Sequence, residues 1–230
     1  MGERPYTLLS CGVSIDGYLD SSATTRLLLS NEADFDRVDG ERSASDAILV
    51  GAGTIRKDNP RLLVRAEHRR AERVARGLPP SPAKVTVTSR AELDCTSNFF
   101  TTGDTVKLVY CQSDATAKAR CRLGAVATVV DAGQPLTLRR VSEDLHDRGV
   151  RRLMVEGGGR VHTQVLTDDL ADELQLVVAP FFVGDPAAHR FVGDGAFPWN
   201  PERRATLAEV RQIGDVVLLR YALSDRFRMS

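Results

Sequence analysis

Residues 153–159 read LMVEGGG, a short apolar run that ends in one glutamate and three glycines. Glycine lets the backbone approach a ligand closely and adopt conformations closed to other residues. The next stretch can form a helix with Val161, Val165 and Leu166 on one face. The free N–H groups and the dipole at such a helix start suit a phosphate. We therefore expect a strand–turn–helix unit that binds an anion, although three glycines can also serve only to make a tight turn.

Outward from this unit, short β-branched runs alternate with polar stretches of helical length. Continuous apolar runs are typical of strands buried on both faces of a parallel sheet. The expected strands lie at 6–14, 47–50, 84–88, 105–111, 126–130, 152–155 and 173–179, and the expected helices at 113–123, 137–148 and 158–166. A further helix is expected after Ser30, which we interpret as its cap, with acidic residues in its first turns.

The end of the chain has a different pattern. Residues 206–212 and 216–222 flank the sequence Ile-Gly-Asp at 213–215, which predicts a closing antiparallel hairpin. The whole pattern indicates the α/β class, with a mostly parallel central sheet flanked by helices. We find no internal repeat and expect one domain over residues 1–230.

Composition excludes several classes of function. Lysine plus arginine and aspartate plus glutamate each number 31, so no global charge favours nucleic acid or an anionic membrane as partner. The four cysteines and four histidines are scattered without zinc-site spacing, and we expect no metal. The most apolar segment, 174–184, is too short to span a bilayer. Residues 1–5 lack a signal-peptide pattern, so we expect a cytoplasmic protein.

Two further motifs follow predicted strands. Residues 50–56, VGAGTIR, begin like a dinucleotide fingerprint, but Arg56 stands where the third glycine belongs, and no phosphate-loop motif is present. Residues 87–90, VTSR, place a hydroxyl and a guanidinium just beyond a strand. Ser89 and Arg90 can hold the 2′-phosphate that distinguishes NADPH from NADH, because arginine matches phosphate geometry. The alternative is an ordinary turn.

These motifs, in this order, resemble the reductase half of the bifunctional deaminase–reductase of riboflavin biosynthesis, over roughly residues 5 to 185. The residues that carry the resemblance are SIDG at 14–17, SDAILVGAGT at 45–54, DNPRLLVR at 58–65, VEGGG at 155–159 and AP at 179–180. The resemblance implies a dihydrofolate-reductase-like fold, a homodimer and NADPH as cofactor. It also implies hydride transfer to C1′ of the ribose in a ribosylaminopyrimidine 5′-phosphate, the activity of a 5-amino-6-(5-phosphoribosylamino)uracil reductase.

The resemblance also implies roles for individual residues. It implies cofactor contacts at Gly12, Thr54, Asp58, Ser89, Gly158, Gly159, Arg160, Val161 and Gln164, and the motifs described above add Arg90 and Gly157. It implies substrate contacts at Arg42, Leu62, Arg65 and Glu156, and we also expect a contact at Thr25. The two arginines of this set can grip a phosphate, and Glu156, the one catalytic candidate, can assist proton delivery as the ribose ring opens. Arg65 also begins a basic stretch that is typical of a solvated face, Glu156 can instead cap nearby amides, and Asp58 can serve only as a turn former.

Two departures from the family pattern matter. The zinc motifs of the companion deaminase are absent, so we expect no deaminase activity. In segment 20–29, Leu27 stands where the family has tryptophan, and Thr25 or Arg26 replaces a serine. Two alternatives therefore stay open: a reductase of dihydrofolate or another pterin or pyrimidine, and a non-catalytic NADPH sensor. Arg42 and Arg65, which can bind a phosphate, favour the phosphorylated sugar over a pterin. The presence of expected substrate-binding residues argues against a sensor, which needs no second pocket.

Overall fold

The structure is a computed structural model that describes residues 2–22 and 27–228. Its internal contacts divide the chain into two compact units, Met1–Pro5 with Asp39–Met154, and Tyr6–Val38 with Val155–Ser230. The boundaries fall inside helix α1 (Glu32–Ala44) and strand β6 (Arg152–Gly157), not in linkers. Because a domain boundary ordinarily falls in an exposed linker, the single domain expected from the sequence stays our prediction.

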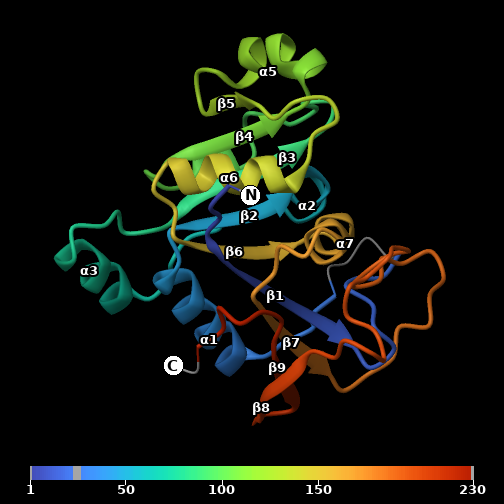
Figure 1. Cartoon of the computed structure of the whole chain (residues 1–230). Helices are drawn as coiled ribbons and strands as arrows, with labels where there is room; N and C mark the ends of the chain where they lie inside the picture. The colour runs from blue at the N-terminus through green and yellow to red at the C-terminus, as the bar shows by residue number, and fades with distance from the viewer. Residues whose placement is uncertain (1, 23–26, 229–230) are drawn as a thin grey trace. The chain divides into compact units, whose positions relative to one another are not determined.

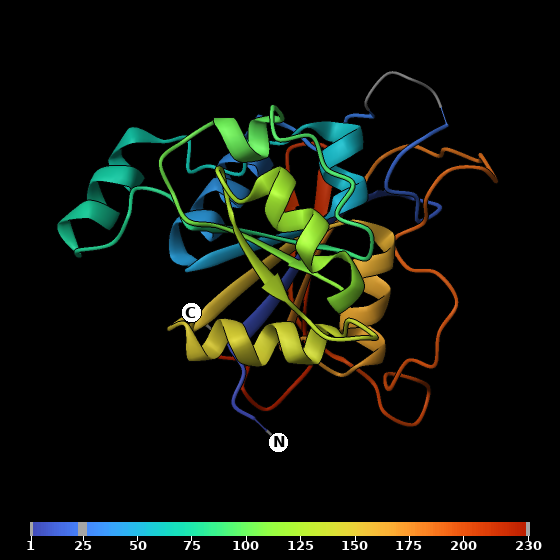
Figure 2. The ribbon, with the colours of Figure 1, turned by 90° about the horizontal axis from the view of Figure 1, so that it is seen from above.

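The first unit contains four parallel strands in the order β5-β4-β3-β2. They are β2 (Ala47–Gly51), β3 (Ala83–Thr88), β4 (Lys107–Cys111) and β5 (Thr128–Asp131). Every residue of β2 is buried, as its unbroken apolar run predicts. Helix α6 (Leu138–Asp147) lies on one face of these strands and α2 (Ala52–Asp58) on the other (Figures 1 and 2). The predicted parallel α/β arrangement is confirmed here.

The second unit joins a parallel pair to an antiparallel hairpin. Strand β1 (Tyr6–Ser14) pairs parallel with β7 (Glu173–Ala179), and β9 (Val216–Ala222) pairs antiparallel with β7. Strand β8 (Thr206–Ile213) pairs with β9 through a turn in which Gly214 has φ of 62°. A core of Val177, Ala179, Val216 and Leu218 packs on one face of these strands. The closing hairpin predicted from the sequence is confirmed.

Helix α1 begins with a different cap from the one predicted. The side-chain oxygen of Asn31 accepts a hydrogen bond from the N–H of Asp34 at 3.0 Å, and the backbone carbonyl of Asn31 accepts one from the N–H of Phe35. The Ser30 hydroxyl instead donates to the Asp34 carboxylate. The prediction of Ser30 as the cap was therefore wrong by one residue, because serine and asparagine both suit this position and stand side by side.

The stretch 65–82, in which no helix was expected, contains helix α3 (Glu67–Ala75), which stands away from the strands of its unit in both views (Figures 1 and 2). Its Arg73 is only 2% exposed, and its guanidinium donates to the carbonyls of Ser43, Ser45 and Pro79. The expectation of a solvated basic face is wrong for Arg73, since three carbonyl acceptors compensate its burial. The remaining short helices are α4 (Asn98–Thr101), η1 (Ser113–Ala115) and α5 (Thr116–Leu123).

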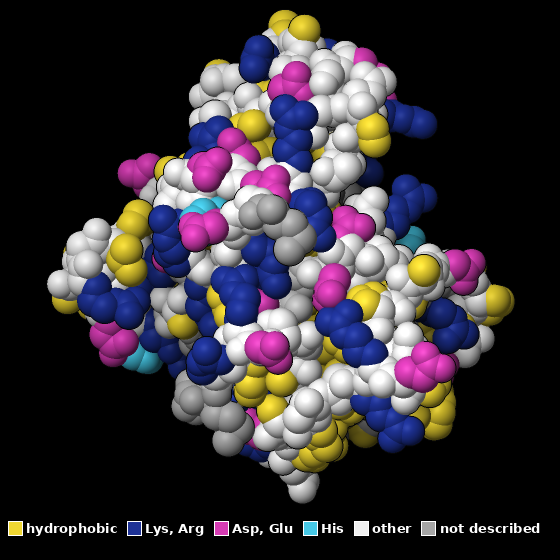
Figure 3. Space-filling view, in the orientation of Figure 1, with side chains coloured by type: hydrophobic (Ala, Val, Ile, Leu, Met, Phe, Trp, Pro, Cys, Tyr) yellow, Lys and Arg dark blue, Asp and Glu magenta, His cyan; other side chains and the backbone are white. Residues whose placement is uncertain are grey.

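The surface agrees with a balanced composition. Basic and acidic side chains are interspersed on the face drawn in Figure 3, without a field of one sign. Among the described residues, no helix combines the length and apolar character needed to cross a bilayer. The same residues contain no group of three or more histidine, cysteine or acidic side chains placed to hold a metal ion.

Candidate cofactor and substrate site

The glycine turn of the second unit connects β6 to helix α7 (Gly159–Thr167). Gly158 is the N-cap of α7 and has φ of 90°, a left-handed conformation that favours glycine. As at any helix start, the first N–H groups of α7 have no acceptor within the helix. This turn therefore has the geometry of an anion-binding helix start, and no side chain caps it.

The third glycine has a structural reason of its own. A Cβ atom on Gly159 would lie 2.6 Å from the carbonyl oxygen of Arg190, so only glycine fits there. The Thr163 hydroxyl donates to the Gly159 carbonyl at 2.7 Å and accepts the N–H of Gly193 at 2.9 Å. The segment around residues 190–193 is thus fastened to the first turns of α7. Close packing, as well as ligand approach, explains part of the glycine run.

The motif at 14–17 fastens another part of the same unit. Its Asp16 accepts the N–H groups of Val183 and Gly184 and the hydroxyl of Ser14. Burial acts to raise the pKa of Asp16, but these hydrogen bonds outweigh it and lower the pKa to about 2. Asp16 is therefore charged at neutral pH and ties the end of β1 to the segment that follows β7.

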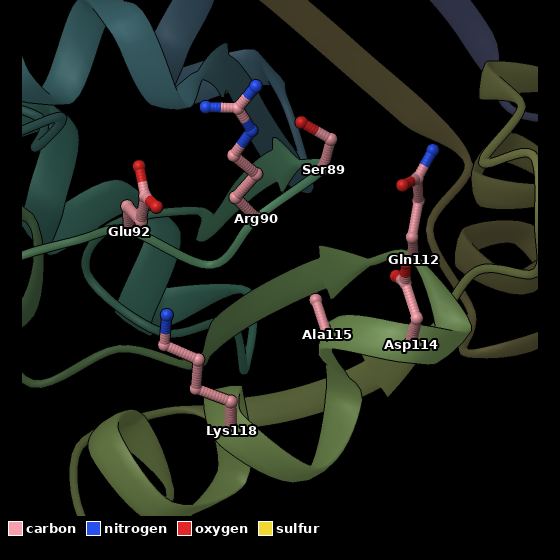
Figure 4. A pocket seen from close by; sticks show the side chains of 7 residues that line it. All are labelled: Ser89, Arg90, Glu92, Gln112, Asp114, Ala115 and Lys118. Carbon is pink, nitrogen blue, oxygen red and sulfur yellow. The ribbon is translucent and has the colours of Figure 1, made fainter.

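A pocket of about 560 Å³ opens in the first unit, at the carboxyl ends of β3 and β4. It contains two residues predicted from the sequence, Ser89 and Arg90, together with Glu92, Gln112, Asp114, Ala115 and Lys118 (Figure 4). The Thr88 hydroxyl accepts the N–H of Ala91 at 3.1 Å and so closes the turn that carries Ser89 and Arg90. Ala91 has φ of 54°, which makes this turn tight.

The pocket combines charged side chains of both signs with neutral hydrogen-bonding groups. Arg90 and Lys118 bring two cations from different elements, and Ser89 and Gln112 add neutral hydrogen-bonding groups. Glu92 and Asp114 balance the charge and can accept from hydroxyl or amino groups. Its volume lies within the 300–1,000 Å³ or so typical of small-molecule sites. The residues present therefore fit a phosphorylated nucleoside such as the 2′-phosphate end of NADPH.

A second group of predicted residues lies after α2. Thr54 and Asp58 are one turn apart on α2, half-buried and exposed respectively. The following loop is unusual, because Asn59 and Leu62 have φ of 43° and 50°. Leu62 is 2% exposed, so its side chain belongs to the core. Leucine in this conformation costs energy and persists only where its surroundings hold it, a pattern that clusters at functional sites.

The remaining predicted residues are distributed as follows. Gly12 lies in β1, where a Cβ would come within 3.1 Å of the Leu29 carbonyl. On α7, Arg160 and Gln164 are exposed on one face, whereas Val161 is 4% exposed and can offer a ligand only its backbone. Gly157 ends β6, and Glu156 is half-buried beside it. Thr25 lies outside the described residues.

Arg42 and Arg65, the two predicted phosphate-gripping residues, belong to the first unit. Arg42 is half-buried on α1 and donates to the Leu63 carbonyl at 3.3 Å. The Arg65 side chain is 57% exposed. The structure thus brings Arg42 to the loop that ends at Arg65.

Sequence reasoning missed the other lining residues of the pocket, notably Gln112 and Lys118. The signal for Gln112 was present, since the strands at 84–88 and 105–111 were both predicted. The carboxyl ends of neighbouring parallel strands meet at one edge of a sheet, where ligands gather. Lys118 is harder to predict, because its position depends on how α5 begins after the 3₁₀ turn.

The parallel strands, the flanking helices and the antiparallel C-terminal hairpin define an α/β protein with the dihydrofolate-reductase-like fold. The model of the RibD C-terminal domain matches residues 5–219, and the chain belongs to that family. This confirms the resemblance that the sequence motifs indicated, and it extends the match into the C-terminal hairpin.

Two relatives of similar length share the name 2,5-diamino-6-ribosylamino-4(3H)-pyrimidinone 5′-phosphate reductase. The protein of that name from Archaeoglobus fulgidus is 35% identical over 79% of this chain and 83% of its own length. The one from Methanothermobacter thermautotrophicus is 32% identical over 96% of this chain and 99% of its own. The family is thus one of reductases, which would use a nicotinamide cofactor.

Solved structures support the fold. A pyrimidine reductase-like protein from Corynebacterium diphtheriae has a TM-score of 0.81 at 23% identity and covers 95% of this chain and 91% of its own. The deaminase/reductase from Thermotoga maritima has a TM-score of 0.78 at 20% identity, over 95% of this chain and 56% of its own. The predicted fold class is confirmed.

Proposed function

We propose that this chain is the NADPH-dependent reductase of riboflavin biosynthesis that converts the ribosyl group of a ribosylaminopyrimidine 5′-phosphate to a ribityl group. The observation that carries the proposal is the match to stand-alone reductases over nearly their full length. Because these relatives are named for the diaminopyrimidinone, we propose that substrate ahead of the deaminated uracil form.

NADPH supplies a hydride from its nicotinamide ring. In our proposal Ser89 and Arg90, helped by Lys118, bind the 2′-phosphate through charge-assisted hydrogen bonds and so select NADPH over NADH. The helix start at Gly157, Gly158 and Gly159 binds the pyrophosphate through backbone N–H groups, among them those of Arg160 and Val161, with the Gln164 side chain nearby. Gly12, Thr54 and Asp58 complete the proposed cofactor contacts.

Substrate binding rests on a separate set of residues. Arg65, whose side chain is more than half exposed, binds the 5′-phosphate, and Arg42 supports the loop that leads to it through the Leu63 carbonyl. Leu62 and Thr25 stay proposed substrate contacts, Leu62 through its backbone because its side chain is buried, and Glu156 accepts a hydrogen bond from the substrate or assists proton delivery at the opening ring. Hydride transfer asks mainly for close positioning of donor and acceptor carbons, so we assign these residues to binding and orientation.

Further elements of the proposal concern assembly and place of action. We propose a homodimer acting in the cytoplasm on a small-molecule substrate, without a nucleic-acid or membrane partner. The reductase of dihydrofolate is the second candidate with this fold. The names of the relatives favour a phosphorylated pyrimidine over dihydrofolate, and the Arg65 side chain, more than half exposed, can bind its phosphate.

Absorbance at 340 nm follows NADPH oxidation and tests the proposal directly. We expect turnover with the diaminopyrimidinone phosphate, slower turnover with the deaminated uracil phosphate and none with dihydrofolate. NADH in place of NADPH should lower kcat/KM at least about tenfold, the discrimination of one lost charged contact. Turnover of dihydrofolate alone would overturn the assignment, and equal use of NADH would remove the role given to Ser89 and Arg90.

A further inference from the structure

Asp39, in the second half of α1, has a buried carboxylate whose partners all come from one other segment. Its side chain is 2% exposed. One oxygen accepts the N–H of Arg65 at 2.6 Å, and the other accepts the N–H of Ala66 at 3.0 Å. The second oxygen also accepts a hydrogen bond from Nη1 of Arg69 at 3.0 Å. A single carboxylate thus satisfies two backbone donors and one guanidinium at the start of α3.

This arrangement supports the start of α3 from a distant part of the chain. Ala66 is the N-cap of α3 and has no side chain that can cap it. Asp39 accepts the N–H groups of this N-cap residue and of the residue before it, and its negative charge lies near the positive end of the α3 dipole. Burial acts to raise the pKa of Asp39, but its hydrogen bonds to Arg65, Ala66 and Arg69 prevail and hold the pKa below its usual range.

The loop that leads into the start of α3 is braced at each step. The Leu63 carbonyl accepts from Arg42, and the N–H of Val64 donates to the Ser81 hydroxyl at 3.1 Å. Together with the positive φ of Leu62, these bonds indicate a backbone held in one conformation. The Arg65 side chain leaves this backbone with more than half of its surface exposed, and its Nε stands 4.0 Å from the Asp39 carboxylate.

We infer that Asp39 is a positioning residue for substrate binding: it fixes the Arg65 backbone and so presents the Arg65 guanidinium to the substrate phosphate. The inference rests on the proposed function, because it needs a phosphorylated substrate. A preset guanidinium loses less conformational entropy on binding than a mobile one. Asp39 therefore acts through Arg65 and does not touch the substrate itself.

Asp39→Asn is the sharpest variant, because it keeps size and shape. Asparagine offers one acceptor oxygen, whereas three donors face the carboxylate, so at least one bond is lost. We expect KM for the pyrimidine phosphate to rise about tenfold, the effect of one lost charge-assisted hydrogen bond. The value of kcat and KM for NADPH should stay within about twofold, since neither depends on the substrate phosphate.

A matched control is Asp46→Asn. Asp46 lies in the same unit and also accepts two backbone N–H groups, those of Arg151 and Arg152, at 2.8 and 2.9 Å. Both N–H groups reach the same oxygen, Oδ2, so asparagine can keep them, and the variant reports the loss of a carboxylate charge away from the Arg65 loop. A general effect of removing a carboxylate charge would appear in both variants, whereas a selective rise in substrate KM in Asp39→Asn supports the inference. An equal rise in the two variants would overturn it.

A double-mutant cycle separates positioning from a merely structural role. In an Arg65→Ala background, Asp39→Asn should add almost nothing to KM for the pyrimidine phosphate, because the residue through which it acts is gone. Full additivity would overturn the inference. Should the wild-type enzyme reduce neither pyrimidine phosphate, the proposed function fails and the inference fails with it. A wild-type enzyme that is active, with KM unchanged in Asp39→Asn, contradicts the inference alone.

Hydrogen exchange on the wild-type enzyme keeps the test valid even if Asp39→Asn does not fold. The amides of Arg65 and Ala66 lie at the start of α3, where helix amides ordinarily exchange fast. Bonds to Asp39 should slow them at least about tenfold relative to that expectation. Unprotected amides at both positions would overturn the inference.

Discussion

The imidazole ring of His162 lies 5.3 Å, centroid to centroid, from the phenyl ring of Phe191. His162 is fully buried on α7, and the Phe191 N–H donates to the Gly17 carbonyl at 3.0 Å. The contact therefore joins the helix after the glycine turn to the segment that also limits Gly159. Burial lowers the pKa of His162 to about 4, and the Phe191 backbone opposes this only in part.

The burial of neutral His162 leads us to predict that the protein loses stability in mild acid. The folded-state pKa of about 4 is below the unfolded value of 6.5, so stability from neutral His162 is complete above pH 6.5 and is lost as pH falls toward 4. The loss should be about 2 kcal/mol between pH 7.5 and pH 5. Urea unfolding at both pH values measures it. His162→Leu should reduce this difference, whereas His68→Gln, on the exposed face of α3, should retain it.

Gly158→Ala tests the anion-binding role of the glycine turn. Gly158 has φ of 90° and Gly149 has φ of 92°, a region that residues with a Cβ rarely adopt, so alanine is strained at both positions. A Cβ on Gly149 would meet nothing within 4 Å, and Gly149 precedes β6 whereas Gly158 follows it, so Gly149→Ala serves as the control for backbone strain. We expect both variants to lose stability and only Gly158→Ala to lose NADPH affinity, about tenfold or more by fluorescence titration. Equal affinities would leave the glycines only a structural role.

Arg90→Ala tests the choice of cofactor. Loss of the guanidinium should raise KM for NADPH about tenfold or more and leave KM for NADH nearly unchanged, because only NADPH carries the 2′-phosphate. Arg120→Ala, on the same helix as Lys118 but outside the pocket lining, is the control for a simple change of net charge. If KM for both cofactors rises equally in Arg90→Ala, the pocket does not recognise the 2′-phosphate.

Strands could be predicted well from this sequence because their signals are local. The runs that became β1 and β7 are β-branched and apolar, and their predicted bounds agree with the structure. Helix α3 could not be predicted in the same way. It depends on support from Asp39 at its start and on Arg73, which is buried against carbonyls of Ser43 and Ser45. These partners lie far away in sequence and have no local pattern.

The residues of the candidate site also differ in whether a local sequence signal or a long-range contact determines them. Ser89 and Arg90 could be found from the sequence alone, because they stand in a short polar sequence directly after a predicted strand. The contributions of Gln112 and Lys118 depend on which strands lie side by side and how α5 starts. The strained backbone at Leu62 has no sequence signal either, since leucine rarely adopts a positive φ.

The exposed edge strand β8 leads to a prediction about assembly. Within the described chain, β8 has a hydrogen-bonded neighbour only on its β9 side, and Leu207 and Val210 are 51% and 59% exposed. An irregularity in pairing between Leu207 and Glu209 disturbs one half of the strand, which leaves the half with Val210 regular. An open, partly apolar edge of this kind is a template for pairing with a second copy.

If the chain forms the expected homodimer through this edge, Val210→Lys should weaken it. A buried lysine in place of valine loses apolar contact and adds a charge, so we expect the dissociation constant to rise about tenfold or more. Light scattering after size exclusion at low micromolar concentration should then give one chain's mass for the variant and two for the wild type. Val74→Lys, at an apolar site 56% exposed on α3, is the control. A dimeric Val210→Lys would place the interface elsewhere, because charged side chains on an edge strand are how natural sheets prevent such pairing.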